Sequence, residues 1–122
     1  MEHRPINPTR MSYAQAHEAS NVSRMLFISG QVPVSCDDHV PHDFKSQCRL
    51  AWANVEAQLK AAEMTLDNLV KVTTFLSDRR YRQENYEARM EVLGERCPAL
   101  TVIITGIYDE AWLLEIEAIA AA

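Results

Sequence analysis

The alternation that decides the fold runs through Leu113-Leu114-Glu115-Ile116-Glu117-Ala118-Ile119, close to the end of the chain. Successive side chains of a β-strand point to opposite faces, so Leu114, Ile116 and Ala118 share one face. Glu115 and Glu117 share the other face with apolar neighbours. The pattern predicts a strand with one buried face and a second face on which two carboxylates stand in an apolar setting.

Two interpretations of Glu115 and Glu117 follow from the pattern alone. In the first, they belong to a solvated face of an edge strand, as is common in antiparallel sheets. In the second, one carboxylate lies in a half-buried cleft, where it orients a water molecule or acts as a base. The spacing of the two residues is compatible with both.

Helices are expected in two places. The first begins near Asp43, a preferred N-cap residue, and its apolar stripe consists of Phe44, Cys48, Ala51, Val55, Leu59 and Ala62. The second covers residues 81–93, and Gly94 is expected to end it. Its apolar side is expected to carry Tyr86, Met90 and Leu93.

Strands are expected over residues 70–76 and 100–104, which are rich in β-branched side chains. A β-hairpin is expected from 13–17 and 25–28, and residues 1–12 are expected to be an irregular lead-in. The elements then follow one another as ββαβαββ within a single domain, residues 1–122. Crossover connections favour an α+β fold in which both helices cover one face of a mixed sheet.

This arrangement leaves apolar side chains on the sheet face that the helices do not cover. Phe75 and Ile119 are expected there, with part of the set Val102, Ile103 and Ile104. Uncovered apolar sheet usually marks a contact surface. A homo-oligomer with closed symmetry is therefore expected.

Composition narrows the function. The chain of 122 residues has a net charge of -5, which argues against a nucleic-acid partner. No apolar run is long enough for a membrane span. Its cysteines, Cys36, Cys48 and Cys97, form no C-x-x-C pair, so reduced thiols and a cytoplasmic location are expected. His39 and His42 lack further ligands, and neither a metal nor a cofactor is expected.

Motifs that resemble those of one known family are spread from Tyr13 to Ala120, in that family's order. They are Leu26-Phe27-Ile28-Ser29-Gly30-Gln31-Val32-Pro33, then Asn54-Val55 and Leu66-Asp67-Asn68-Leu69-Val70-Lys71-Val72-Thr73, then Cys97-Pro98-Ala99 and Leu114-Glu115-Ile116-Glu117-Ala118-Ile119-Ala120. The family that they resemble is YjgF/RidA, the reactive intermediate deaminases.

The resemblance implies a chorismate-mutase-like homotrimer with a small-molecule cleft at each subunit interface. Family members hydrolyse enamines or imines to a keto acid and ammonia without a metal or cofactor. An arginine holds the substrate carboxylate, and a glutamate helps to hold the attacking water. By position, Glu115 matches this catalytic glutamate, while Glu117 is expected to be exposed or in subunit contacts. The positions that match substrate-binding residues are Tyr13, Ser29, Gly30, Asn85, Leu100 and Val102.

The chain departs from the family at the arginine, because Leu100 follows Pro98 and Ala99. A guanidinium offers a planar fork of donors to a carboxylate, and leucine offers none. The loss amounts to about 2–4 kcal/mol for a desolvated pair. Arg82, Arg89 and Arg96 are other arginines that could supply a cation from a different direction.

Three functions are compatible with these residues. The first is a hydrolytic deaminase with weak or no activity on 2-imino acids, acting on another imine or enamine or holding the carboxylate differently. The alternative is a metabolite-binding module without turnover. RNA cleavage, ascribed to some members of the family, is third because the chain is acidic.

Overall fold

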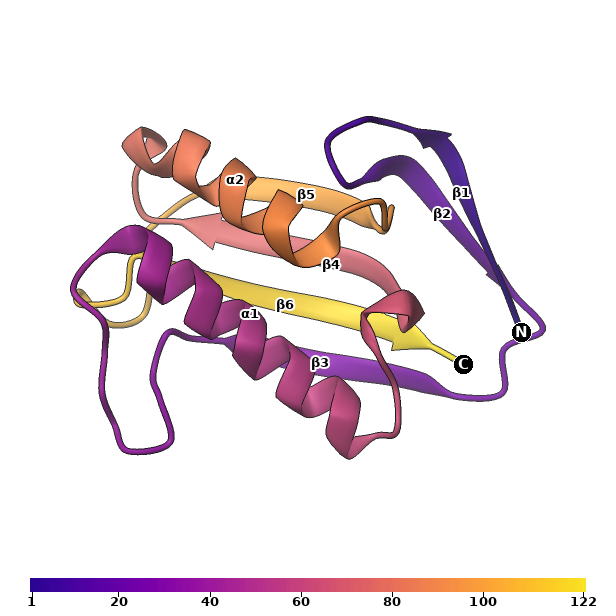
Figure 1. Ribbon diagram of the computed structural model, residues 1–122, viewed down its shortest axis with the longest axis horizontal. Helices are drawn as coiled ribbons and strands as arrows, with labels where there is room; N and C mark the ends of the chain where they lie inside the picture. Colours follow the sequence, from indigo (N-terminus) through magenta and orange to yellow (C-terminus); the bar gives the residue numbers. More distant parts are fainter.

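The alternating segment at the end of the chain is strand β6 (Leu114–Ala121), and it lies within a six-stranded sheet. In the computed structural model, which describes residues 1–122, the strand order is β1-β2-β5-β4-β6-β3. The other strands are β1 (Glu2–Pro8), β2 (Ala14–Ser20), β3 (Met25–Gln31), β4 (Leu69–Leu76) and β5 (Ala99–Ile104). β5 runs parallel to β2 and β4, and the other neighbours are antiparallel, so the sheet is mixed (Figure 1).

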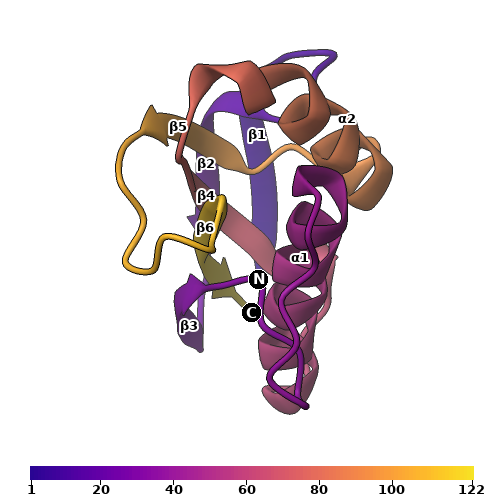
Figure 2. The same cartoon turned by 90° about the vertical axis from the view of Figure 1, so that its left-hand side faces the viewer.

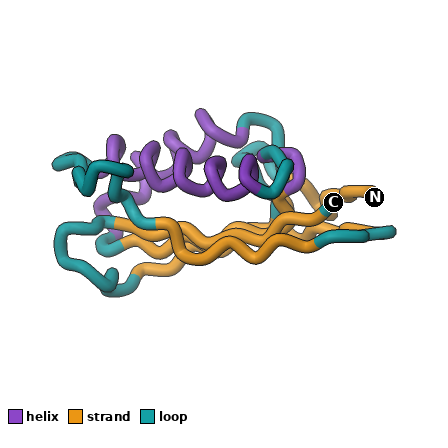
Figure 3. The backbone as a smooth tube through the Cα atoms, turned by 90° about the horizontal axis from the view of Figure 1, so that it is seen from below, coloured by secondary structure: helices purple, strands orange, loops and turns teal.

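Two α-helices, α1 (Phe44–Ala61) and α2 (Arg82–Leu93), cover the same face of the sheet (Figures 1 and 3). Short 3-10 turns at Leu66–Asn68 and Arg79–Tyr81 precede β4 and α2. The element order is the expected ββαβαββ, preceded by one more strand. The α+β class and the single helical layer are therefore confirmed.

The core lies between the helices and the sheet. Asp43 caps α1 by accepting a hydrogen bond from the backbone of Ser46 at 3.0 Å, as expected for an N-cap aspartate. The inner stripe of α1 packs on the inward side chains of β4 and β6. The core residues with 0–1% exposure on these elements are Cys48, Ala51, Trp52, Val55, Leu59, Val72, Leu76, Leu114, Ile116 and Ala120.

The opposite face of the sheet has no covering layer within the chain. Figure 3 shows the helices above the strands and no element below them, and Figure 2 shows α1 and α2 on one side of the sheet. Phe27 is 69% exposed, Met25 56% and Ile103 42%. A bare apolar sheet face of this kind is the feature that the sequence predicted.

The N-terminal expectations were wrong. Residues 1–12 are not irregular, because β1 pairs antiparallel with β2 from Glu2↔Ser20 to Pro8↔Ala14. Its prolines are tolerated because β1 is an edge strand, where a missing N–H breaks no ladder. The segments 13–17 and 25–28 form no hairpin with each other: β2 lies beside β5, and β3 pairs with β6 at the far edge.

Helix α2 turns a different side to the sheet than its apolar residues suggest. The buried residues are Asn85, Ala88, Arg89 and Leu93, whereas Tyr86 and Met90 are only half-buried. Ala88 is fully buried, and Asn85 and Arg89 are buried on the same side of the helix. No helix is long and apolar enough to cross a membrane.

The histidine pair between β1 and β2 predicts a pH dependence of stability. His3 Nδ1 lies 2.8 Å from His17 Nε2, and His17 Nδ1 lies 2.9 Å from the Cys97 carbonyl oxygen. Burial, followed by repulsion from His17, lowers the pKa of His3 below its usual 6.5. The unfolded chain therefore binds more protons just below pH 6.5, and the free energy of unfolding falls as pH drops through that range.

We expect His3→Gln to flatten this part of the stability curve, measured by urea unfolding between pH 5 and 7.5. His39→Gln removes an exposed loop imidazole and is the control. If the free energy of unfolding of His3→Gln depended on pH as that of the wild type does, a role of the histidine pair in this dependence would be contradicted.

Candidate functional site

Glu115 is placed by its contact with Gly30. A Cβ atom added to Gly30 would lie 2.6 Å from the Glu115 carboxyl carbon and 3.0 Å from its Cγ, closer than such atoms approach in proteins. Any residue other than glycine would therefore displace the carboxylate. Glu115 is half-buried and takes part in none of the ion pairs of the chain.

A bulge in β3 brings Gly30 to this position. Ile28 pairs with Ala118 and Gln31 with Ile116, so Ser29 and Gly30 together stand opposite Glu117. The extra residue of a bulge bends its strand and redirects side chains, and bulges are frequent beside functional sites. Ser29, Gly30 and Glu115, three of the predicted site residues, therefore form one cluster, which we call the β3–β6 cluster.

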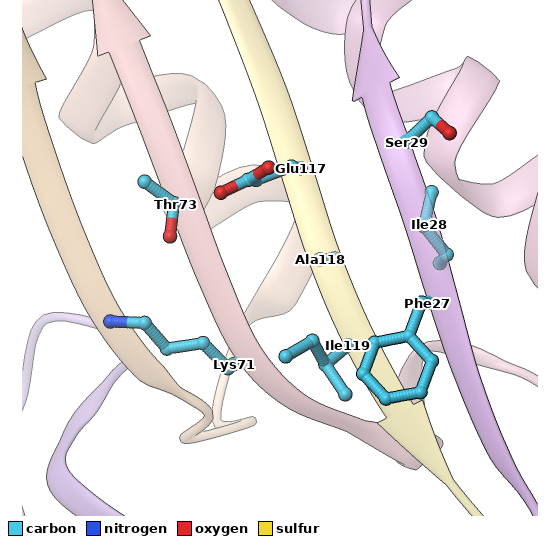
Figure 4. A pocket seen from close by; sticks show the side chains of 8 residues that line it. All are labelled: Phe27, Ile28, Ser29, Lys71, Thr73, Glu117, Ala118 and Ile119. Carbon is cyan, nitrogen blue, oxygen red and sulfur yellow. The ribbon is translucent and has the colours of Figure 1, made fainter.

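A depression of about 300 Å³ on the open face adjoins this cluster (Figure 4). Thr73 of β4 stands opposite Glu117 of β6, and Lys71 donates a hydrogen bond from Nζ to Thr101 Oγ1 at 2.6 Å. The other residues that line the depression are Phe27, Ile28, Ser29, Ala118 and Ile119. Glu117, rather than Glu115, lines this depression, so the assignment of Glu115 to a cleft stays a prediction.

Leu100 and Val102 lie on the other face of the sheet. They pair in register with Val72 and Thr74, whose side chains are buried under the helices. Leu100 packs against the hydrophobic core. The position at which the family resemblance requires an arginine is thus occupied by a packing residue on the helix side.

Asn85 lines the same cavity as Val102 and Arg89, and Tyr13 lies beside Arg89. The Arg89 guanidinium carbon is 5.9 Å from the centre of the Tyr13 ring and 5.6 Å from that of Tyr86. Its Nη2 and Nε donate to the Met11 carbonyl at 3.2 and 3.4 Å. Asn85 accepts a weak hydrogen bond from the Cys48 thiol at 3.9 Å.

Asn85, Tyr86 and Arg89 border a cavity of about 340 Å³ between α2, β5 and the turn before β2, which we call the α2 cavity. Its lining residues are Met11, Leu76, Arg82, Gln83, Asn85, Tyr86, Arg89 and Val102. Of the arginines that could supply a cation, Arg82 and Arg89 line this cavity, whereas Arg96 is paired with Asp67 at 2.7 Å. Only the packing of α2 on the sheet distinguishes Arg89 from the other arginines. The apolar pattern of the sequence could not do so, because it pointed to a different side of the helix.

The predicted site residues thus fall into two clusters that do not meet within one chain. The β3–β6 cluster, with Glu115 of β6, lies on the open face. The α2 cavity, with Val102 of β5, lies on the helix face. In the sheet, β4 lies between β5 and β6. Alternation along β4 puts Val72 and Thr74 on one face and Thr73 and Phe75 on the other, so the two clusters face in opposite directions.

Cys48, the buried cysteine, is not placed as a reactive thiol. All three cysteines are free, and burial raises the pKa of the Cys48 thiol to about 12, which keeps it protonated at neutral pH. No group of three or more His, Cys, Asp or Glu side chains is placed to hold a metal ion.

Comparison with known proteins gives a consistent result across the chain. Residues 3–122 match the family described as endoribonuclease L-PSP. A RutC family protein of Pyrococcus horikoshii is 36% identical over 119 residues, covering 96% of this chain and 89% of that protein. The mitochondrial protein mmf2 of Schizosaccharomyces pombe is 32% identical over 121 residues, 96% of each chain.

Solved structures share the fold. A Rid family protein of unknown function from Yersinia pestis superimposes with a TM-score of 0.87 at 22% identity over 100% of both chains. Escherichia coli TdcF, solved with bound serine, gives a TM-score of 0.75 at 26% identity over 98% of this chain and 99% of its own. TdcF is named as a reactive intermediate deaminase, and 59 residues, 48% of this chain and 46% of TdcF, align with it at 36% identity.

The contact between Gly30 and Glu115 can be tested by adding one methyl group. We expect Gly30→Ala to keep the fold, with a loss of about 1 kcal/mol or less, because the end of a flexible side chain can move aside. The carboxylate should move, and the Glu115 carboxyl carbon signal in NMR should shift. Gly106→Ala, which adds a methyl group where nothing lies within 4 Å, is the matched control. An unmoved Glu115 signal in Gly30→Ala would contradict the geometry.

Proposed function

The chain belongs to the endoribonuclease L-PSP family, the YjgF/RidA family that the motifs resemble, and on this premise we propose that it forms a homotrimer with a small-molecule cleft between subunits. In this proposal Glu115 of one subunit faces the α2 cavity residues of the next. The ligand is a small imine, enamine or carboxylic acid. Turnover of short 2-imino acids is weak or absent because Leu100 replaces the arginine.

The observation that carries the proposal is the separation of the two clusters. Glu115 with Ser29 and Gly30 lies on the open face, and Asn85 with Val102 lies on the helix face. A second copy of the chain is the simplest source of the missing half. The uncovered apolar face, with Phe27 and Ile103 exposed, gives such copies a surface on which to associate.

The chemistry proposed for the complete cleft is hydrolysis of a C=N bond. Glu115 would hold a water molecule and take its proton as the water attacks the C=N carbon. The attack gives a carbinolamine, whose nitrogen takes up the proton that Glu115 received from the water. The hydroxyl proton then passes to the nitrogen, and ammonia leaves as the C–N bond breaks and the C=O bond forms. Correct placement of the substrate against that water supplies several kcal/mol of the barrier, and Leu100 contributes no donor to this placement.

A metabolite-binding module without turnover is the second candidate. It is favoured by the packing of Leu100 against the core, because a site that has lost its carboxylate clamp can retain a ligand by shape alone. RNA cleavage, which the name of the family suggests, is not supported by the net charge of -5, because phosphate contacts need basic groups.

The association of subunits is tested by light scattering. We expect a mass of about three times 13.9 kDa at micromolar concentration, since the exposed sheet face is otherwise left in water. Phe27→Glu places a charge on that face and should shift the population towards monomer. The exposed Tyr108→Glu, in the loop before β6, is the control. A stable wild-type monomer would exclude an interface cleft.

Turnover is tested with 2-iminopropanoate generated in place by an amino-acid oxidase. We expect the wild type to accelerate its decay little, and Leu100→Arg to restore part of the activity because the clamp returns where the family carries it. Leu100→Arg/Glu115→Gln should lose that gain.

Two results would contradict this account. Wild-type activity that Glu115→Gln does not reduce would remove Glu115 from the chemistry. An inactive Leu100→Arg protein that remains a trimer would favour the binding module, because the cleft would then differ from an active one by more than one residue.

A further inference from the structure

Arg89 is a buried cation without a buried anion. The residue is 5% exposed, and none of the five ion pairs of the chain includes it. A buried charge is normally paired, because transfer from water costs several kcal/mol even after relaxation. Burial lowers the pKa of the Arg89 guanidinium, and the nearby Tyr13 and Tyr86 oppose that change. Its partners within the chain are one carbonyl group and two aromatic rings.

The Arg89 guanidinium has N–H groups that make no hydrogen bond within the chain. It carries five N–H groups, of which Nε and Nη2 point to the carbonyl of Met11. Nη1 has no hydrogen-bond partner in the chain and is not among the polar atoms sealed from solvent. Since Arg89 lines the α2 cavity, these free N–H groups are accessible from it.

Asn85 adds a second unused donor at the same place. It is 4% exposed, its oxygen accepts from Cys48, and its Nδ2 donates to no group of the chain. Asn85 stands one helical turn before Arg89 on the same side of α2, so both side chains border one cavity. A buried guanidinium and a buried amide with free N–H groups in one cavity form a site for a small anion.

We propose that the α2 cavity binds the carboxylate of a small organic acid through Arg89 and Asn85, so that α2 supplies the cation that β5 lacks at Leu100. The inference rests on the proposed function, because it identifies the carboxylate site of the same cleft. Arg82 and Gln83 line its rim, and Met11 and Val102 provide apolar surface for a short carbon chain. A single buried guanidinium matches a single negative charge.

The site differs from the family arrangement in where it holds the carboxylate. A carboxylate held by α2 lies at a different place from one held on β5. A 2-imino acid bound there would not place its C=N carbon where the arginine of the family would place it. Binding without efficient turnover of 2-iminopropanoate is the combination that this geometry favours.

A purely structural role for Arg89 is the competing explanation. The turn before β2 is tied to α2 by Arg89 through Met11 and by Ser12, which has a positive φ of 59° and donates to the Gly94 carbonyl. If holding this turn were the whole role of Arg89, removing the guanidinium would lower stability and leave anion binding unaffected.

The test compares pyruvate with pyruvamide, a neutral molecule of nearly the same shape, by calorimetry on the assembled full-length protein. We expect pyruvate to bind at least about tenfold more tightly than pyruvamide, and Arg89→Met to remove that preference. Arg96→Met removes an arginine of the same length from an exposed ion pair and should bind pyruvate as the wild type does. Equal pyruvate affinity in the wild type and Arg89→Met would overturn the proposal.

A second measurement needs no variant. Addition of pyruvate to the ¹⁵N-labelled wild type should shift the side-chain signals of Arg89 and Asn85, while pyruvamide should leave the Arg89 signal in place. Unmoved Arg89 and Asn85 signals at saturating pyruvate would overturn the proposal even where Arg89→Met fails to fold. Arg89-dependent binding in a monomeric protein would instead refute the interface cleft alone. Arg89-dependent binding together with turnover that is independent of Glu115 would refute the role of Glu115 alone.

Discussion

The rest of this structure depends on the strict alternation of β4 and β6, the two central strands. Val72, Thr74 and Leu76 of β4 and Leu114, Ile116 and Ala118 of β6 point into the helical layer and carry the core. Because the period of a strand is two, the residues between them are forced onto the opposite face whatever their chemistry. Glu115 and Glu117 are therefore carried to a face that the chain itself leaves uncovered.

An element of the fold could be predicted where the pattern that specifies it lies within neighbouring residues of the sequence. The alternation of residues 113–119 and the apolar stripe of α1 are local patterns, and they gave the correct elements and the correct faces. The pairing of β2 with β5 is not local: its single register pair, Ala14↔Ala99, joins segments far apart in sequence, whereas sequence proximity favoured a hairpin of β2 with β3. Prolines in residues 1–12 suggested irregular chain, although an edge strand accepts them.

The candidate site shows the same division. Gly30 and Glu115 were each singled out by their motifs, but the bulge that puts one against the other arises from a register change between β3 and β6. Arg89 could be named only as one arginine among several. Its burial depends on which side of α2 packs on the sheet, and the apolar residues Tyr86 and Met90 pointed to a different side.

A buried arginine is costly to keep, and the way in which it is kept bears on the site. The Met11 carbonyl and the rings of Tyr13 and Tyr86 stabilise the guanidinium without neutralising it. A carboxylate of the chain in place of these neutral partners would form an internal ion pair with Arg89 and would fill the role of the ligand. The neutral partners instead leave the positive charge available. Arg89 and Glu115 lie on opposite faces of the sheet, so Glu115 cannot form that pair within a subunit. This arrangement is suited to an anionic ligand.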